Sequence, residues 1–206
     1  MFDMFLNFDL SVFEWIQSIQ CGFLNAVMVF ITTLGNAGAI FIVLALVLLC
    51  TKKYRKAGLA VAVALIVMLI CNDLFLKEFL ARPRPFNLLA TDPEKYAFWG
   101  EGYVYPELIG KPSSYSFPSG HTSSAFAAAI ALLCHNRKLG IPVTIFAAIM
   151  GFSRIYVEVH YCTDVIAGVV SGTICALIAV LIVKFLFPVV DNGINKLSAK
   201  LKKEKA

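Results

Sequence analysis

Residues 57–76, AGLAVAVALIVMLICNDLFL, form an apolar run that is broken only by Asn72 and Asp73 near its end. A helix needs about 20 such residues to cross the hydrocarbon core of a bilayer. Four basic residues precede the run at 52–56, and a polar stretch with several prolines follows it at 77–118. The run therefore predicts a transmembrane helix, and its flanks predict where that helix leaves the bilayer.

The rest of the chain has the same apolar character. Of its 206 residues, 59% are hydrophobic and 15% are charged, whereas a water-soluble domain carries about 25% charged residues. We therefore expect an all-α polytopic membrane protein that forms a six-transmembrane-helix bundle as a single domain over residues 1–206. The predicted spans are 18–34, 38–51, 57–76, 119–135, 140–157 and 160–187, with an outer loop at 77–118 and a basic tail at 188–206.

Shorter patterns give four local predictions. Residues 9–20 are amphipathic and predict either an interfacial helix or the start of the first span. The sequence Gly-Asn-Ala-Gly at 35–38 predicts a turn, and Pro188 predicts the end of the last span. Gly168 and Gly172 predict close helix packing, either within the chain or in a homodimer.

Basic residues cluster in the 52–56 turn, in the 135–138 turn and in the tail. Such clusters lie on the cytoplasmic side of membrane proteins. We therefore expect a multi-pass protein of the cell membrane with both termini cytoplasmic and the 77–118 loop outside. The tail suits attraction to anionic membrane lipids, and because no folded basic patch accompanies it, we expect no nucleic-acid partner.

Three charged stretches fall at the predicted outer ends of spans. They are KEFLARPRP at 77–85, PSGH at 118–121 and SRIYVEVHYCTD at 153–164. Cations clustered at a membrane repel one another unless an anion lies among them. Lys77, Arg84 and Arg154 are of the type that binds a phosphoryl group, arginine through its paired donors and lysine as a point charge.

The PSGH stretch predicts the start of a helix. Ser119 would cap it, and Gly120 would let an anion approach the free amides of the first turn. These amides and the helix dipole favour a bound phosphate. We therefore expect phosphate binding without a metal or another cofactor.

His160 and Asp164 lie four residues apart, which on a helix places them on one face. The carboxylate would then hold one imidazole nitrogen as a donor and leave the other as an outward-facing nucleophile. His121 comes from a different span and could protonate the leaving oxygen and later activate water. Together these residues predict a two-step phosphoryl transfer.

The three stretches resemble the signature motifs of the type 2 phosphatidic acid phosphatase superfamily, the lipid phosphate phosphatases. That pattern is Lys, six residues, Arg-Pro; then Pro-Ser-Gly-His; then Ser-Arg, five residues, His, three residues, Asp. It matches this chain at Lys77, Arg84 and Pro85, at 118–121, and at Ser153, Arg154, His160 and Asp164. Glu158 and Cys162 stand where many relatives have glycine and proline, so the chain departs from the pattern in this local loop.

The resemblance implies a six-helix membrane bundle with its site near the outer surface. It implies that His160 is the nucleophile that forms a phosphohistidine, that Asp164 is its partner and that His121 is the acid. The phosphate ligands that it implies are Lys77, Arg84, Arg154, Ser119 and Gly120.

Several alternatives stay open from the sequence. The lipid phosphate substrate could be undecaprenyl diphosphate, phosphatidylglycerophosphate or phosphatidic acid. The chain could instead pass the phosphoryl group to another acceptor, or transport a lipid or anion without catalysis. Arg82 fits a phosphate ligand and a solvated loop charge equally well. Asp73 could orient Lys77, but helix capping or packing is the favoured interpretation for it and for Asn72.

Overall fold

The computed structural model describes residues 3–87 and 106–203, with side chains for 4–87 and 106–196. This part of the chain is helical and contains no strand, which confirms the predicted all-α class. Its elements are α1 (Asp3–Ile19), α2 (Gly22–Leu34), the 3-10 turn η1 (Asn36–Gly38), α3 (Ala39–Cys50), α4 (Arg55–Met68), the π-helical segment η2 (Leu69–Leu76), α5 (Lys77–Leu80), α8 (Gly120–His135), α9 (Arg137–Tyr156) and α10 (Cys162–Lys203). The middle of the predicted outer loop, residues 88–105, lies outside the described residues.

Helix α8 is the centre of the hydrophobic core. It contacts α4, α9 and α10, and its alanines 125, 127, 128, 129 and 131 are fully buried. Small side chains let neighbouring backbones approach closely, which is how helices pack when lipid removes the hydrophobic driving force. This central packing fixes the start of α8, and with it the PSGH stretch, against the start of α10.

Gly168 and Gly172 of α10 face α8 of the same chain. A Cβ at Gly172 would lie 2.4 Å from the carbonyl oxygen of Ser123, and a Cβ at Gly168 would lie 2.9 Å from Cβ of Thr122. Of the two uses predicted for these glycines, the structure shows the packing within one chain.

The predicted count of six spans is not confirmed. Within the described residues, three stretches are long and apolar enough to cross a membrane: Arg55–Asn87, Arg137–Tyr156 and Cys162–Lys196. Helices α2 and α3 would make a fourth span that bends by 47°. Helix α8 has 16 residues, which is short for a full crossing.

The bend between α2 and α3 falls at the predicted turn, residues 35–38. Ala37 and Gly38 both adopt left-handed backbone conformations there, with φ of 51° and 67°. Such a conformation is costly for a residue with a Cβ and easy for glycine. Helices α2 and α3 therefore form one bent unit, and the turn between them lines the site described below.

Helix α10 continues through Pro188 to Lys203, so the predicted end of the last span at Pro188 is wrong. Proline removes one backbone hydrogen bond, but side-chain contacts hold the helix beyond it. Arg55 donates to Oδ1 of Asp191 at 2.6 Å and to Oδ1 of Asn195 at 3.3 Å. These contacts fix the segment after the proline to the start of α4.

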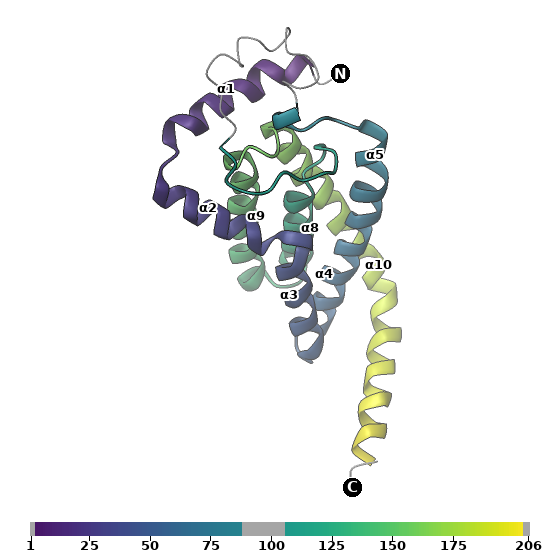
Figure 1. Ribbon diagram of the computed structural model, residues 1–206. Helices are drawn as coiled ribbons and strands as arrows, with labels where there is room; N and C mark the ends of the chain where they lie inside the picture. The colour runs from purple at the N-terminus through teal and green to yellow at the C-terminus, as the bar shows by residue number, and fades with distance from the viewer. Residues whose placement is uncertain (1–2, 88–105, 204–206) are drawn as a thin grey trace.

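The two ends of the chain lie at opposite ends of the bundle (Figure 1). Asp9 of α1 contacts Arg82 and Thr163 at the end where α10 begins, whereas the far end of α10 extends away from it. The expectation that both termini are cytoplasmic stays a prediction. Residues 3–19 form a separate helix, α1, which contacts α9 and α10 and is followed after two residues by α2.

Replacing Gly172 with alanine should destabilise the protein by about 1–3 kcal/mol, because the new Cβ would collide with the backbone of α8. The measurement is the melting temperature of the detergent-solubilised protein. Gly193→Ala is the matched control, since it lies on the same helix with no atom within 4 Å of its Cβ position. A Gly172→Ala variant as stable as the Gly193→Ala variant would contradict this packing.

Candidate active site

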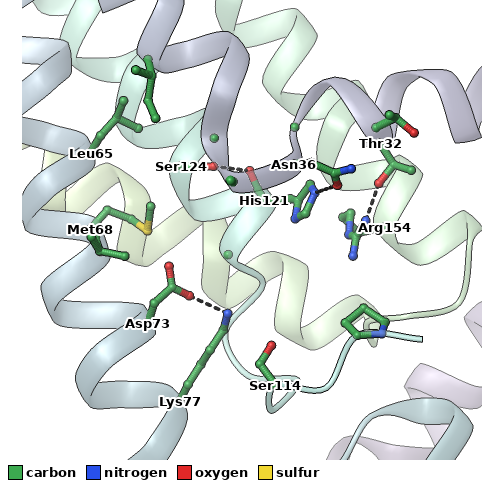
Figure 2. A pocket seen from close by; sticks show the side chains of 18 of the residues that line it. Thr32, Asn36, Leu65, Met68, Asp73, Lys77, Ser114, His121, Ser124 and Arg154 are labelled. Atoms are coloured by element: carbon green, nitrogen blue, oxygen red, sulfur yellow. Dashed lines mark hydrogen bonds and ion pairs between the residues drawn. The ribbon is translucent and has the colours of Figure 1, made fainter. Parts of the chain in front are cut away.

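A cavity of about 950 Å³ opens at the end of the bundle where α8 begins. Six of the eight predicted site residues line it, and they come from all three charged stretches: Lys77, Arg84, Gly120, His121, Arg154 and His160. Figure 2 shows the side chains of Lys77, His121 and Arg154, which belong to α5, α8 and α9, directed into the same space. The fold therefore brings the three charged stretches to one place.

Lys77 forms an ion pair with Asp73, one helical turn earlier, with 2.5 Å between Nζ and Oδ1 (Figure 2). The pair lies against the start of α8, since a Cβ at Gly120 would be 3.1 Å from both of these atoms. Asp73 thus orients Lys77, which is the less favoured of its two predicted uses. Asn72 is buried nearby and donates to Ser171 at 2.9 Å.

Arg84 lines the cavity and donates to backbone and side-chain acceptors. It donates to the carbonyl oxygen of Ser114 at 2.6 Å, to that of Val159 at 2.7 Å and to Oγ of Ser114 at 3.1 Å. Arg154 is also buried and donates to the hydroxyl of Thr32 on α2. Both guanidinium groups are therefore placed before any anion binds.

His160 lies between α9 and α10 and is only 1% exposed. Its Nε2 is 3.2 Å from Nη1 of Arg84, and its Nδ1 is 3.5 Å from both Oγ of Ser116 and Oδ2 of Asp164. Arginine can only donate, so Nε2 is the acceptor and Nδ1 carries the hydrogen. The lone pair of Nε2 thus points at Arg84, where the sequence predicted a freely outward-facing nitrogen.

The surroundings of His160 favour its neutral form. Burial, followed by the positive charges of Arg84, Arg154 and Lys77, holds the pKa of His160 well below its ordinary value. Removing an imidazolium from water and placing cations beside it both disfavour protonation. A neutral imidazole keeps the Nε2 lone pair that a nucleophile requires.

Asp164 is fully buried in the first turn of α10. It accepts from Nη1 of Arg82 at 2.5 Å, from the amide of Tyr161 at 3.0 Å and from the hydroxyl of Ser116. His160 precedes the helix, so the two residues do not share a helix face as predicted. The carboxylate reaches the imidazole both at 3.5 Å and by way of Ser116.

Arg82 is neither a phosphate ligand nor a solvated loop charge. It is 3% exposed and lies between two carboxylates, with 2.8 Å to Asp9 and 2.5 Å to Asp164. Its guanidinium also stacks 3.9 Å above the ring centre of Tyr161. The two sequence interpretations both fail because they overlooked a partner from α1.

Ser119 is the N-cap residue of α8, but its side chain makes no capping hydrogen bond. Its hydroxyl accepts from Thr122 at 3.0 Å, and its amide donates to the carbonyl oxygen of Asp164 at 3.1 Å. Fully buried, it joins α8 to α10 and does not line the cavity. At the start of α8 it is Gly120 and His121, which follow Ser119, that line the cavity.

His121 lines the cavity from the first turn of α8 and contacts the bend between α2 and α3. Its Nε2 is 3.2 Å from Oδ1 of Asn36 (Figure 2). A Cβ at Gly35 would lie 2.7 Å from Cδ2 of the imidazole, so a side chain there would displace His121. The break in the α2 and α3 unit thus positions the second histidine.

Sequence reasoning missed Asp9, Thr32, Asn36 and Ser116. Only Asp9 carried a usable signal, because it shares the buried face of an amphipathic helix with Phe13 and Ile16 at spacings of four and seven residues. The other three are ordinary polar residues whose partners are far away in the sequence. Among the described residues, no group of three His, Cys, Asp or Glu side chains is placed to hold a metal ion.

The cavity continues from its cationic end into an apolar groove along α3 and α4. Ile42 and Leu46 of α3 and Ile66 of α4 line it, and their side chains are exposed. A single space therefore offers positive charge at one end and an apolar groove at the other.

Comparison with known proteins gives consistent results. The PAP2 superfamily pattern matches residues 53–188. The chain is 34% identical to the undecaprenyl-diphosphatase BcrC of Bacillus subtilis (strain 168) over 86% of this chain and 88% of that protein. It is 32% identical to an undecaprenyl-diphosphatase of Sulfolobus acidocaldarius over 82% of this chain and 75% of that protein.

Two solved structures have a similar fold. The crystal structure of Aquifex aeolicus LpxE superposes with a TM-score of 0.67 at 26% identity, covering 82% of this chain and 93% of that chain. A PAP2-type phosphatidylglycerolphosphate phosphatase from Bacillus subtilis shares the fold, with a TM-score of 0.63 over 84% of this chain and 83% of that one. The matched region contains all three charged stretches, and the chain belongs to the PAP2 superfamily of membrane phosphatases.

Proposed function

We propose that the chain hydrolyses a lipid phosphate or diphosphate through a phosphohistidine on His160, without a metal ion. The observation that carries the proposal is the division of one cavity into a cationic end with two histidines and an apolar groove lined by exposed side chains of α3 and α4. A lipid phosphate has the matching two-part chemistry.

The phosphoryl group would lie among Lys77, Arg84 and Arg154, with the first amides of α8 as further donors. Preorganised positive charge of this kind stabilises the charge on phosphoryl oxygens in the transition state. Because Arg84 and Arg154 are already fixed by Ser114, Val159 and Thr32, little reorganisation is needed on binding. These cations supply the charge that a metal supplies in other phosphatases.

In the first step, Nε2 of His160 attacks phosphorus while the bond to the leaving oxygen breaks. His121 gives that oxygen a proton, and Asp164 with Ser116 stabilises the hydrogen on Nδ1 of His160. In the second step, His121 takes a proton from water, the water oxygen bonds to phosphorus and the N–P bond breaks. Inorganic phosphate and free His160 result.

Undecaprenyl diphosphate is the substrate that the two relatives named above favour. The relatives also include a phosphatidylglycerophosphatase B, 29% identical over 75% of this chain, which keeps phosphatidylglycerophosphate as the second candidate. Phosphatidic acid shares the same headgroup chemistry. Phosphoryl transfer to another acceptor would use the same first step and would differ only in what replaces water.

We further propose that the site faces the outside of the cell membrane. The basic 52–56 turn contacts the far part of α10, through Arg55 with Asp191 and through Lys56, 5.8 Å from the ring centre of Phe187. This basic end lies away from the cationic end of the cavity, which is at the other end of α4, and basic ends favour the cytoplasm.

His160→Ala should lower phosphate release by about 10⁴-fold or more, because it removes the nucleophile. The assay compares wild type and variant on undecaprenyl diphosphate, phosphatidylglycerophosphate and phosphatidic acid, with EDTA present throughout. His135→Ala is the matched control, since this histidine lies at the end of α8 away from the cavity and should keep the wild-type rate. Comparable turnover by the His160→Ala variant, or wild-type turnover that requires added magnesium, would contradict the proposal.

Filling the groove should separate lipid from soluble substrates. Ala62→Trp places a large side chain in the apolar lining and should lower kcat/KM for the long-chain lipid about tenfold. Turnover of a small soluble phosphate ester should change little. Val47→Trp, on the exposed surface of α3, is the control, and equal losses on both substrates would argue against a lipid path in the groove.

A further inference from the structure

Asp9 is a fully buried carboxylate that the three charged stretches do not include. It lies on the same face of α1 as Phe13 and Ile16, which pack into a hydrophobic cluster with Tyr161 and Val165. A buried charge is costly unless it is paired and hydrogen-bonded. The partners of Asp9 should therefore show what it does.

Both carboxylate oxygens of Asp9 bind at the start of α10. Oδ1 accepts from the amide of Thr163 at 2.9 Å, and Oδ2 accepts from the hydroxyl of Thr163 at 2.7 Å. Oδ2 also accepts from Nη2 of Arg82 at 2.8 Å. Helix α1 is thus joined to the residue that directly precedes Asp164.

Arg82 connects Asp9 to Asp164. Its Nη2 binds Asp9, while its Nη1 binds Asp164 at 2.5 Å and the hydroxyl of Thr163 at 2.8 Å. The guanidinium is planar and rigid, so holding one nitrogen on Asp9 sets the direction of the other. The contact with Tyr161 fixes the plane of the group from one side.

The charges of Asp9, Arg82 and Asp164 also matter. Arg82 carries one positive charge and faces two carboxylates, so Asp164 keeps negative charge to offer to Nδ1 of His160. If Asp9 were neutral, the positive charge of Arg82 would act on Asp164 alone. It would then weaken the attraction between the Asp164 carboxylate and the N–H group at Nδ1 of His160. Neither Asp9 nor Arg82 lines the cavity, so such a change should affect the chemical step more than binding.

We propose that Asp9 is a positioning residue for phosphoryl transfer, which acts through Arg82 to hold and polarise the Asp164 carboxylate that orients His160. The inference rests on the proposed function.

The test is Asp9→Asn, which keeps an oxygen for the Thr163 amide and removes the charge. We expect kcat for phosphate release from the lipid substrate to fall about 10- to 100-fold, the effect of losing one hydrogen bond between charged groups. KM and inhibition by inorganic phosphate should stay within about threefold. Asp191→Asn is the matched control, because it also removes the carboxylate partner of an arginine, Arg55, at the opposite end of the bundle.

Two further variants separate positioning from folding. Asp9→Glu keeps the charge and should recover most of the lost kcat, whereas a residue that only fills space would not be rescued in this way. In an Asp164→Asn background, Asp9→Asn should have little further effect on kcat, because coupled residues are not additive. If Asp9→Asn does not fold, Thr163→Val is the substitute. It removes the hydroxyl that contacts both Asp9 and Arg82, and it should lower kcat about threefold at unchanged KM.

A wild-type kcat in Asp9→Asn or in folded Thr163→Val, or a full effect of Asp9→Asn in the Asp164→Asn background, would overturn the inference. So would a loss of kcat in Asp191→Asn equal to that in Asp9→Asn. Failure of the proposed function is a different result, in which the wild type itself releases no phosphate from any lipid.

Discussion

The burial of the Asp164 carboxylate is the constraint on which the site depends. A charged oxygen inside a helix bundle needs a donor at each lone pair, and Asp164 obtains its donors from separate segments: Arg82, Ser116 and the amide of Tyr161. Its backbone carbonyl also receives the amide of Ser119 at the start of α8. The segments that carry the three motifs are therefore joined at one residue, which places His160, the cations and the start of α8 around a common space.

Charge balance explains why this arrangement suits a phosphate. Arg82 shares its single positive charge between Asp9 and Asp164, and Asp73 is paired with Lys77. Within the described residues, Arg84 donates to Ser114 and Val159, and Arg154 donates to Thr32, all of which are neutral groups. The described lining of the cavity holds three cations, Lys77, Arg84 and Arg154, and one carboxylate, Asp73, which suits an anion. The same three cations add to burial in keeping His160 neutral.

The sequence was informative wherever charge stood in an apolar context. Lys77, Arg84, His121, Arg154 and His160 were predicted because ionisable residues at the ends of spans are costly unless they have a use, and the structure gathers them at one cavity. Hydropathy likewise identified the helices, since their apolar runs are long compared with the loops.

Other features could not be predicted because they depend on tertiary partners. Pro188 normally ends a helix, but the contacts of Arg55 with Asp191 carry α10 past it. Ser116 and Asn36 are ordinary polar residues until folding brings them to His160 and His121. The side of the bundle occupied by α1 follows from the contacts of Asp9 with Arg82 and Thr163, which no local pattern specifies.

The central claim is that the phosphoryl group becomes bonded to Nε2 of His160. Its most direct test is rapid quenching of the wild-type protein with a lipid diphosphate that carries labelled phosphorus. We predict a labelled protein whose bond is stable in base and labile in acid, with the label on the peptide that contains His160. Turnover of the lipid without any labelled protein at any quench time, or label on a different residue, would contradict the account.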